Sequence, residues 1–166
     1  MFENKNKIEY SLIAGVPDNW VIGNGLKIPW YIPEDFQLFK KKTLNSVVIM
    51  GQTTWDSLPI KPLPKRINIV LNRNLIKNKG AETFQDMEKA FKFAKNQNKK
   101  IFVIGGASIY NQTIKNATYL YISHIKGTFE GNVFFPKFKK KDYEIIETQE
   151  FDKFTFCKYK KNNKNL

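Results

Sequence analysis

Residues 20–42 join a glycine- and proline-rich loop to a helix-forming segment, and this segment carries the first candidate for chemistry. Pro33 suits the first position of a helix, and the acidic residues after it favour the positive end of the helix dipole. At about 100° per residue, Asp35, Phe36 and Phe39 share one helix face. A carboxylate flanked by two rings, beneath a loop that carries Trp30, would bind a planar, nitrogen-rich ligand. The alternative is an acidic first turn that only caps a helix above two core phenylalanines.

A pair of glycines, Gly105 and Gly106, follows an apolar run and precedes a helical segment. Without side chains, the pair lets a ligand approach the backbone, and the helix start offers free N–H groups to a phosphate. The spacing is not the Gly-x-Gly-x-x-Gly of a Rossmann fingerprint. A tight strand-to-helix turn without any ligand also explains the pair.

Gly51 repeats this arrangement, because it ends a second apolar run and is followed by the hydroxyls of Thr53 and Thr54. These hydroxyls either bind a phosphate or cap a short helix. Arg73, directly after a third apolar run, suits a phosphate monoester, and Arg66 suits bidentate pairing with a carboxylate. Each arginine taken alone is also typical of a solvated surface.

The chain has one histidine and one cysteine. His124 lies in an alternating segment, which favours a structural strand residue. With so few soft ligands, we expect no His/Cys metal site, and no Ser/His/Asp or Cys/His arrangement is suggested. Cys157 cannot form an internal disulfide, which favours a reducing, cytoplasmic setting.

These candidates need a scaffold that brings them together. Apolar runs and spacing predict strands at residues 8–16, 46–50, 67–71, 81–84, 101–104, 118–126, 143–150 and 151–159, and helices at 33–42, 52–58, 85–95 and after 106. The alternating order favours an α/β fold: one domain over residues 1–166, with a mostly parallel sheet, helices on both faces and an antiparallel C-terminal edge. Ligands bind such sheets beyond the carboxyl ends of the strands, where Gly51, Arg73 and Gly105 would converge.

Basic residues outnumber acidic residues by 28 to 15, which gives a net charge of +13. This excess suits nucleic acid, anionic small ligands, or a compositional bias in lysine- and asparagine-rich surface segments. We expect no specific nucleic-acid partner, because no binding motif accompanies the charge. No apolar run approaches the length of a membrane span, and the first seven residues lack a signal-peptide core.

The motifs taken together resemble dihydrofolate reductase in order and approximate spacing, from about Ser11 to Lys160. The matching segments are residues 11–16, 21–23, 28–30, 33–36, 39–40, 48–51, 54–55, 62–64 and 103–106, with Arg66 and Tyr110. The resemblance implies an α/β fold with a central, mostly parallel eight-stranded sheet. It also implies NADPH-dependent reduction of 7,8-dihydrofolate to 5,6,7,8-tetrahydrofolate, which supports one-carbon and thymidylate metabolism. A monomer without an obligate protein partner, and binding of antifolate inhibitors, are the matching expectations.

The resemblance also implies roles for single residues. Asp35 would bind the 2-amino group and N3 of the pterin and favour protonation at N5, so that hydride adds at C6. Thr54 would support this network with Ser123 nearby, Trp30 would lie over an ordered water, and Arg66 would clamp the glutamate carboxylate. The implied substrate contacts are Ile13, Ala14, Ile28, Asp35, Phe36, Phe39, Thr54, Leu58, Leu63, Arg66, Ile104, Tyr110 and Ser123.

A second set of contacts is implied for the cofactor NADPH. It comprises Ala14, Gly15, Ile22, Gly23, Gly51, Gln52, Thr53, Thr54, Leu71, Asn72, Arg73, Ile104, Gly105, Gly106, Ala107, Ser108, Ile109 and Tyr110. The resemblance further implies a cis peptide between the paired glycines and a mobile lid over residues 17–31.

Four departures from the family pattern limit this transfer. The contacts of the lid tip, residues 24–27, do not transfer. Gln52 stands where many relatives have an arginine for the 2′-phosphate, so Arg73 would carry that recognition alone. Ser108 replaces a basic or bulky residue, and residues 58–62 contain one extra position. Two alternatives stay open: a pterin- or flavin-precursor reductase of the same fold, against which Arg66 favours a glutamate-bearing substrate, and a basic nucleic-acid-binding protein.

Overall fold

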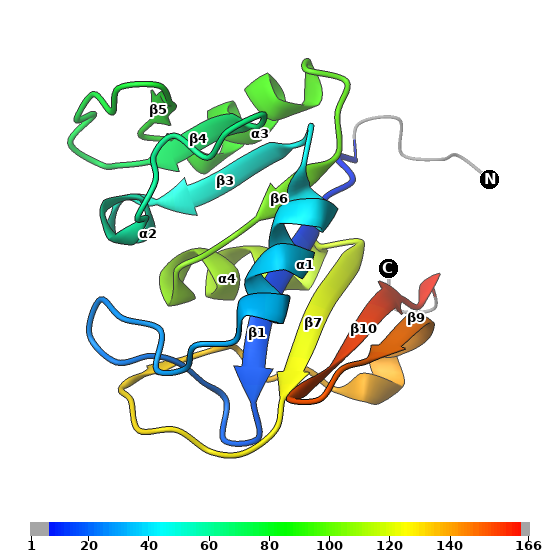
Figure 1. Cartoon of the computed structure of the whole chain (residues 1–166). Helices are drawn as coiled ribbons and strands as arrows, with labels where there is room; N and C mark the ends of the chain where they lie inside the picture. Colours follow the sequence, from blue (N-terminus) through cyan, green and yellow to red (C-terminus); the bar gives the residue numbers. More distant parts are fainter. Residues whose placement is uncertain (1–6, 164–166) are drawn as a thin grey trace.

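One large sheet forms the centre of the protein, and the computed structural model describes residues 7–163. The sheet strands are β1 (Ser11–Pro17), β3 (Val47–Gly51), β4 (Ile67–Leu71), β5 (Glu82–Phe84), β6 (Ile101–Val103), β7 (Tyr119–Ile125), β9 (Tyr143–Glu150) and β10 (Phe154–Lys161). Their order is β5-β4-β3-β6-β1-β7-β10-β9 (Figure 1). All neighbours from β5 to β7 pair in parallel, and β10 is antiparallel to β7 and β9. The predicted eight-stranded sheet with an antiparallel C-terminal edge is confirmed.

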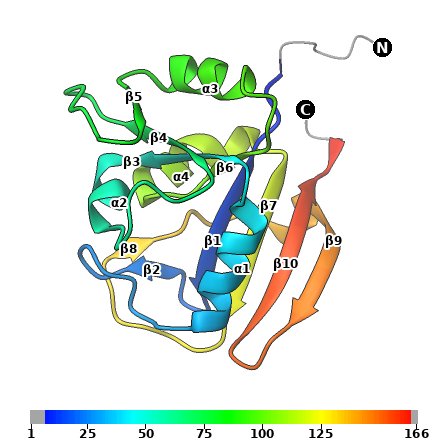
Figure 2. The ribbon, with the colours of Figure 1, turned by 45° about the horizontal axis from the view of Figure 1, so that its top comes forward.

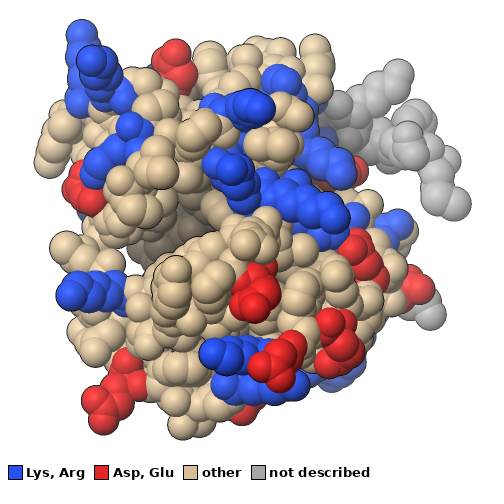
Figure 3. Space-filling model, viewed as in Figure 1, with Lys and Arg blue, Asp and Glu red and all other residues tan. Residues whose placement is uncertain are grey.

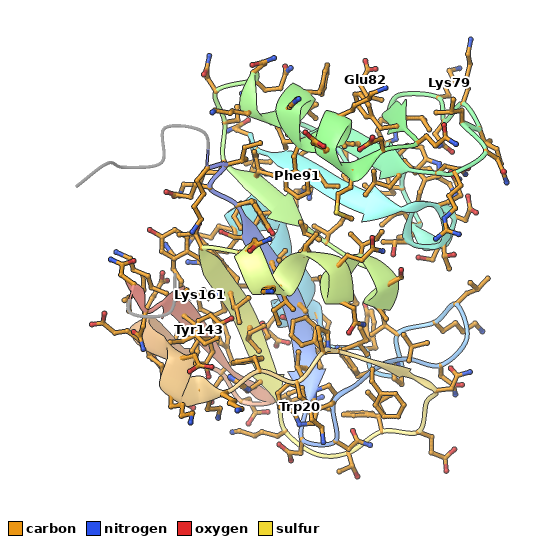
Figure 4. The ribbon with its side chains drawn as sticks, turned by 180° about the vertical axis from the view of Figure 1, so that it is seen from behind. Trp20, Lys79, Glu82, Phe91, Tyr143 and Lys161 are labelled. Carbon is orange, nitrogen blue, oxygen red and sulfur yellow. The ribbon has the colours of Figure 1, made fainter. Side chains whose placement is uncertain are left out.

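Helices cover both faces of the sheet. They are α1 (Pro33–Thr43), α2 (Gln52–Ser57), α3 (Met87–Lys95) and α4 (Ala107–Thr113), with short 3-10 turns η1 (Ile114–Asn116) and η2 (Lys140–Asp142). Leu38 of α1 and Trp55 of α2 belong to one apolar core, and Phe91 of α3 and Tyr110 of α4 to the other. Accordingly α1 lies in front of the sheet in Figure 1, and α4 lies in front when the molecule is seen from behind in Figure 4.

The middle strands form because their side chains are apolar on both faces. Val47, Val48 and Ile49 of β3 are fully buried, since helices pack against both sides of the sheet. Such continuous apolar runs are typical of parallel strands, which need cover on both faces. This burial fixes the carboxyl ends of the strands as one shared edge.

Most predicted elements are present with shifted ends. β10 begins at Phe154 rather than at residue 151, because the Phe151 N–H donates to the Phe154 carbonyl across a turn, at 2.9 Å. α3 begins at Met87 rather than at residue 85, because the Asp86 side chain accepts from two backbone N–H groups and caps the helix. Residues 1–6, in the segment without a signal-peptide core, lie outside the described residues.

A second sheet was not predicted. It is an antiparallel ribbon of β2 (Val21–Gly23) and β8 (Val133–Phe134), which Figure 2 shows beside the main sheet. Strands of three and two residues are too short to produce a periodic pattern.

Every helix among residues 7–163 is too short or too polar to cross a lipid bilayer.

Candidate active site

The carboxyl ends of β3 and β6 meet at the glycines that the sequence singled out. The Gly51 N–H donates to the Gly105 carbonyl at 2.9 Å, and the Ile104 N–H donates to the Ile49 carbonyl at 2.9 Å. Figure 3 shows the surface hollowed between the α2 region and the loop that follows β2. Parallel strands therefore bring the glycine motifs to one concave edge, as expected for a ligand site in such a sheet.

Asp35 lies in the first turn of α1, where Pro33 begins the helix. Its N–H donates to the Ile32 carbonyl at 3.0 Å, and its carboxylate turns toward the sheet and is half-buried. Burial raises the pKa of Asp35 above its ordinary value, and a hydrogen bond with the Ser123 side chain lowers this pKa in part. A carboxyl group with a raised pKa, set at a concave edge, is typical of an acid–base site.

Gly15 of β1 brings the backbone close to this carboxylate. A Cβ at Gly15 would stand 3.0 Å from Asp35 Oδ2 and 3.1 Å from Trp30 Cζ2. The Trp30 ring packs against Phe129 with centroids 5.5 Å apart. Asp35 and Trp30, which were predicted from one segment, thus both lie close to Gly15 of β1.

Ser123 supplies a hydroxyl that is hydrogen-bonded to Asp35. β7 pairs with β1 so that Ser123 lies opposite Gly15. Thr54 Oγ1 instead stands 3.4 Å from the position of a Cβ on Gly106. The structure therefore places Thr54 at the glycine pair, which suits its predicted cofactor role.

The apolar side chains that were predicted to wall the ligand come from several elements and differ in exposure. Ile13 is buried, whereas Phe36 is 40% exposed and Ile28 is 52% exposed. The half-buried members of the predicted wall are Ala14, Phe39, Leu58, Leu63 and Ile104. Half-exposed apolar side chains around a half-buried carboxylate suit a flat ligand with an apolar body and a polar edge.

Arg66 lies at the opposite end of α1 from Asp35. Its Nη1 donates to Thr43 Oγ1 at 3.1 Å, its Nε donates to the Pro64 carbonyl at 3.0 Å, and its Cζ lies 5.9 Å from the Phe39 ring centroid. Burial lowers the pKa of Arg66, but a guanidinium remains charged in proteins. Thr43 is eight residues after Asp35, or about 12 Å along the helix axis. An elongated ligand with a carboxylate tail would span the two charges.

Tyr110 connects the paired glycines with β1. Its hydroxyl donates to the Ile13 carbonyl at 2.7 Å, and its ring lies 3.1 Å from the position of a Cβ on Gly105. The peptide between Gly105 and Gly106 is cis, as the resemblance implied. Burial, and secondarily the charge of Asp35, raise the pKa of Tyr110, so its hydroxyl stays protonated as a donor. The tyrosine holds the two halves of the site together.

Three side-chain amides lie at the neighbouring carboxyl ends of β3 and β4. Gln52 is hydrogen-bonded to both Asn72 and Asn78, and the last two are buried. Asn78 was missed by sequence reasoning, because it lies in a polar stretch and belongs to no motif. Arg73 is exposed immediately after Asn72.

The predicted lid, residues 17–31, is tied to the segment that leads into β8. Asp18 and Gly127 exchange two hydrogen bonds of 3.0 Å, one through the Asp18 side chain. The Asn132 N–H donates to the Gly23 carbonyl at 3.1 Å, and Asn132 Oδ1 accepts from the Gly25 N–H at 3.1 Å. Of the remaining predicted cofactor residues, Ile22, Leu71, Ala107 and Ile109 are half-buried, and Thr53 and Ser108 are exposed.

The side chains that were considered for metals or nucleophiles have structural settings. His124 Nε2 lies 2.7 Å from the Tyr159 hydroxyl, and burial lowers its pKa. Cys157 is buried. Within residues 7–163, no group of three or more His, Cys, Asp or Glu side chains is arranged to hold a metal ion.

Comparisons with known proteins agree with this geometry. The family model for dihydrofolate reductase matches residues 9–163. The chain belongs to the dihydrofolate reductase family. A dihydrofolate reductase of Buchnera aphidicola subsp. Acyrthosiphon pisum is 44% identical over 133 residues, which are 80% of this chain and 82% of that protein. One from Neisseria meningitidis serogroup A is 41% identical over 144 residues, 86% of this chain and 88% of that protein.

A solved dihydrofolate reductase extends the comparison to the fold. The enzyme from Enterococcus faecalis, complexed with NADP(H) and RAB-propyl, superimposes with a TM-score of 0.85 at 27% identity and covers 95% of this chain and 98% of that one. As a member of the dihydrofolate reductase family, this chain is an NADP-dependent oxidoreductase that reduces dihydrofolate.

Proposed function

We propose that Asp35 and Arg66 bind the two ends of 7,8-dihydrofolate during its NADPH-dependent reduction to 5,6,7,8-tetrahydrofolate. The observation that carries this assignment is their placement at opposite ends of α1, with apolar side chains between them. Dihydrofolate has the matching order of groups: a pterin, an apolar benzoyl ring and a glutamate. Arg66 Nη1 and Nη2 face the α-carboxylate, and a charge-assisted pair there orients the whole substrate.

Asp35 acts on the pterin at the other end. Its ionised oxygens accept hydrogen bonds from N3–H and the 2-amino group, which fixes the ring between Ile13, Phe36 and Phe39. Burial raises the pKa of the carboxyl group, which brings its proton exchange closer to neutral pH. The carboxyl group thereby favours protonation at N5, with Trp30 covering the water that would relay the proton. Protonation at N5 makes C6 electrophilic.

The glycine motifs let two helices pack closely against the ends of β3 and β6. A Cβ at Gly51 would lie 3.3 Å from Ile109 of α4, and one at Gly106 would lie 3.4 Å from Thr54 of α2. When bound there, NADPH supplies the hydride that adds to C6. Gly51, Gly105 and Gly106 would admit the cofactor, and Thr54 would hydrogen-bond it. Arg73 pairs with the 2′-phosphate.

The same proposal covers the setting of the enzyme. The chain acts as a single-domain monomer in the cytoplasm, without an obligate protein partner or a specific nucleic-acid ligand. Flat 2,4-diamino antifolates bind Asp35 in place of the substrate, because they present the same pair of N–H donors. The buried free thiol of Cys157 suits a reducing compartment.

The decisive experiment is oxidation of NADPH by purified protein with 7,8-dihydrofolate, with and without methotrexate. We expect inhibitable turnover with NADPH and slower turnover with NADH. A dihydropterin without the benzoylglutamate should be a poor substrate. If it reacts as well as dihydrofolate, the assignment of Arg66 is wrong, and a precursor reductase of the same fold becomes the better description.

A further inference from the structure

The side chain of Gln52 has no free hydrogen-bonding capacity. Its Nε2 donates to Asp56 Oδ1 and to Asn78 Oδ1, both at 2.9 Å. Its Oε1 accepts from Asn72 Nδ2 at 2.8 Å and from Asn78 Nδ2 at 3.0 Å. A glutamine amide offers two donors and two acceptor lone pairs, so all four are used within the protein. Gln52 therefore cannot bind a phosphate without giving up one of these partners.

Asn78 holds this arrangement in place. It is 9% exposed and forms a reciprocal amide pair with Gln52. Its Nδ2 also lies 3.1 Å from the Ile76 carbonyl and 3.2 Å from Thr83 Oγ1. Asn78 thus ties the β4–β5 connection to the start of α2, and it does so from a buried position where an unpaired amide would be costly.

Asn72 transmits this constraint to Arg73. The Asn72 amide donates to Gln52, and its Oδ1 accepts from the Asn74 N–H at 2.7 Å. Its carbonyl accepts from the Leu75 N–H at 3.2 Å. Both hydrogen bonds close the turn that carries Arg73, so the backbone on either side of this arginine is fixed to the amide cluster of Gln52, Asn72 and Asn78.

Lys79 is another cation of the connection between β4 and β5, and its side chain has a different orientation. Figure 4 shows Lys79 directed outward beside Glu82, away from the body of the protein. Asp56, which accepts from Gln52, adds a negative charge on the α2 side of the cluster. The favourable position for an anion is therefore on the Arg73 side.

We propose that Asn78 is a positioning residue for NADPH selectivity: through Gln52 and Asn72 it fixes the turn of Arg73, which reads the 2′-phosphate. This inference rests on the proposed location of the cofactor. It gives Gln52, which the resemblance implied as a cofactor contact, an internal structural role. Selectivity then comes from one pre-organised arginine rather than from two basic side chains.

The test compares NADP+ and NAD+ binding by calorimetry, because these two probes differ in the 2′-phosphate and their binding does not depend on turnover. Asn78→Ala removes the amide, and Asn78→Leu does so while keeping the branched shape of the side chain. We expect NADP+ affinity to fall about 3- to 10-fold in each, which corresponds to about 0.7–1.4 kcal/mol, because the turn of Arg73 loses its hydrogen-bonded support. NAD+ affinity and the KM for dihydrofolate should change by less than about twofold.

A double-mutant cycle separates positioning from a general structural role. If Asn78 acts through Arg73, the ratio of NADP+ to NAD+ affinity should be the same in Arg73→Met as in the double variant that also carries Asn78→Ala. Asn96→Ala, an exposed asparagine at the C-terminal end of α3, is the matched control and should leave the ratio unchanged. Full additivity with Arg73→Met, or equal losses for both nucleotides, would overturn the proposal. If the unmodified protein binds neither nucleotide, the proposed cofactor site itself is wrong.

Discussion

The Asp35 carboxylate lies against the backbone of Gly15, so closely that a Cβ at Gly15 would be 3.0 Å from Asp35 Oδ2. The same Cβ would be 3.1 Å from Trp30 Cζ2. Contacts of 3.0 Å require a neighbour to shift, and here both neighbours belong to the proposed pterin site. The position of the carboxylate therefore depends on the absence of a side chain in the adjacent strand.

A branched side chain at Gly15 should accordingly displace Asp35 and Trp30 together. For Gly15→Val we expect kcat/KM for dihydrofolate to fall about 10- to 100-fold, because a misplacement of this size disrupts a reacting geometry. Gly15→Ala should have a smaller effect, since each neighbour has to move by only a few tenths of an ångström. Steady-state kinetics on both variants, with circular dichroism as the folding control, checks this order. Equal activity in the two would contradict it.

Replacing Asp35 should separate activity from stability. Asp35→Asn keeps the shape but removes the ionisable group, so hydride transfer in single turnover should slow about 10²- to 10⁴-fold. The melting temperature at neutral pH should rise, by about 2–4 °C for each kcal/mol gained, because burial disfavours the charged carboxylate. A loss of both activity and melting temperature would indicate that Asp35 serves the fold instead.

The pH dependence of that stability difference has a definite sign. The folded-state pKa of Asp35 is raised, so the native state binds its proton more tightly than the unfolded state does. Unmodified protein should therefore lose stability relative to Asp35→Asn as pH rises from the ordinary carboxyl pKa through the raised one, and the difference should vanish in acid below the ordinary value. Denaturant unfolding of both proteins across this window measures it.

Arg66 should matter for the substrate and not for the cofactor. Arg66→Leu removes a charge-assisted pair with the glutamate carboxylate, and we expect the KM for dihydrofolate to rise roughly 10- to 100-fold. The KM for NADPH should stay within about twofold, because additivity holds for separate sites. Thr43→Val, which removes the Nη1 partner of Arg66 together with the hydroxyl that donates to the Phe39 carbonyl, should show a weaker version of the same selectivity. A comparable loss for both ligands would refute this role.

Much of the site was accessible from the sequence because its residues stand at element boundaries. Pro33 and the acidic residues after it located the start of α1, and hence Asp35. Gly51 and Gly105 end apolar runs, and the parallel order of their strands predicted that they meet. Such inferences need only local chemistry and the common direction of the strands.

The remaining features depend on pairing between distant segments. Which hydroxyl faces Asp35 is decided by the register of β7 against β1, which places Ser123 opposite Gly15, and no local pattern encodes that register. Asn78 similarly reaches Gln52, 26 positions away in sequence, from a loop whose composition predicts only exposure. The β2–β8 ribbon forms between two strands that are each too short to be recognised.

Tyr110 offers a test of how the site is held together, independent of turnover. Its hydroxyl donates to the Ile13 carbonyl at 2.7 Å, and both residues are buried. Tyr110→Phe leaves that carbonyl without its donor, which should lower the free energy of unfolding by about 1–3 kcal/mol. Because burial raises the pKa of Tyr110, this contribution should be constant across neutral pH. Tyr31→Phe, at a side chain that is 78% exposed, is the matched control. Equal stability of both variants in urea would mean that the hydrogen bond does not couple α4 to β1.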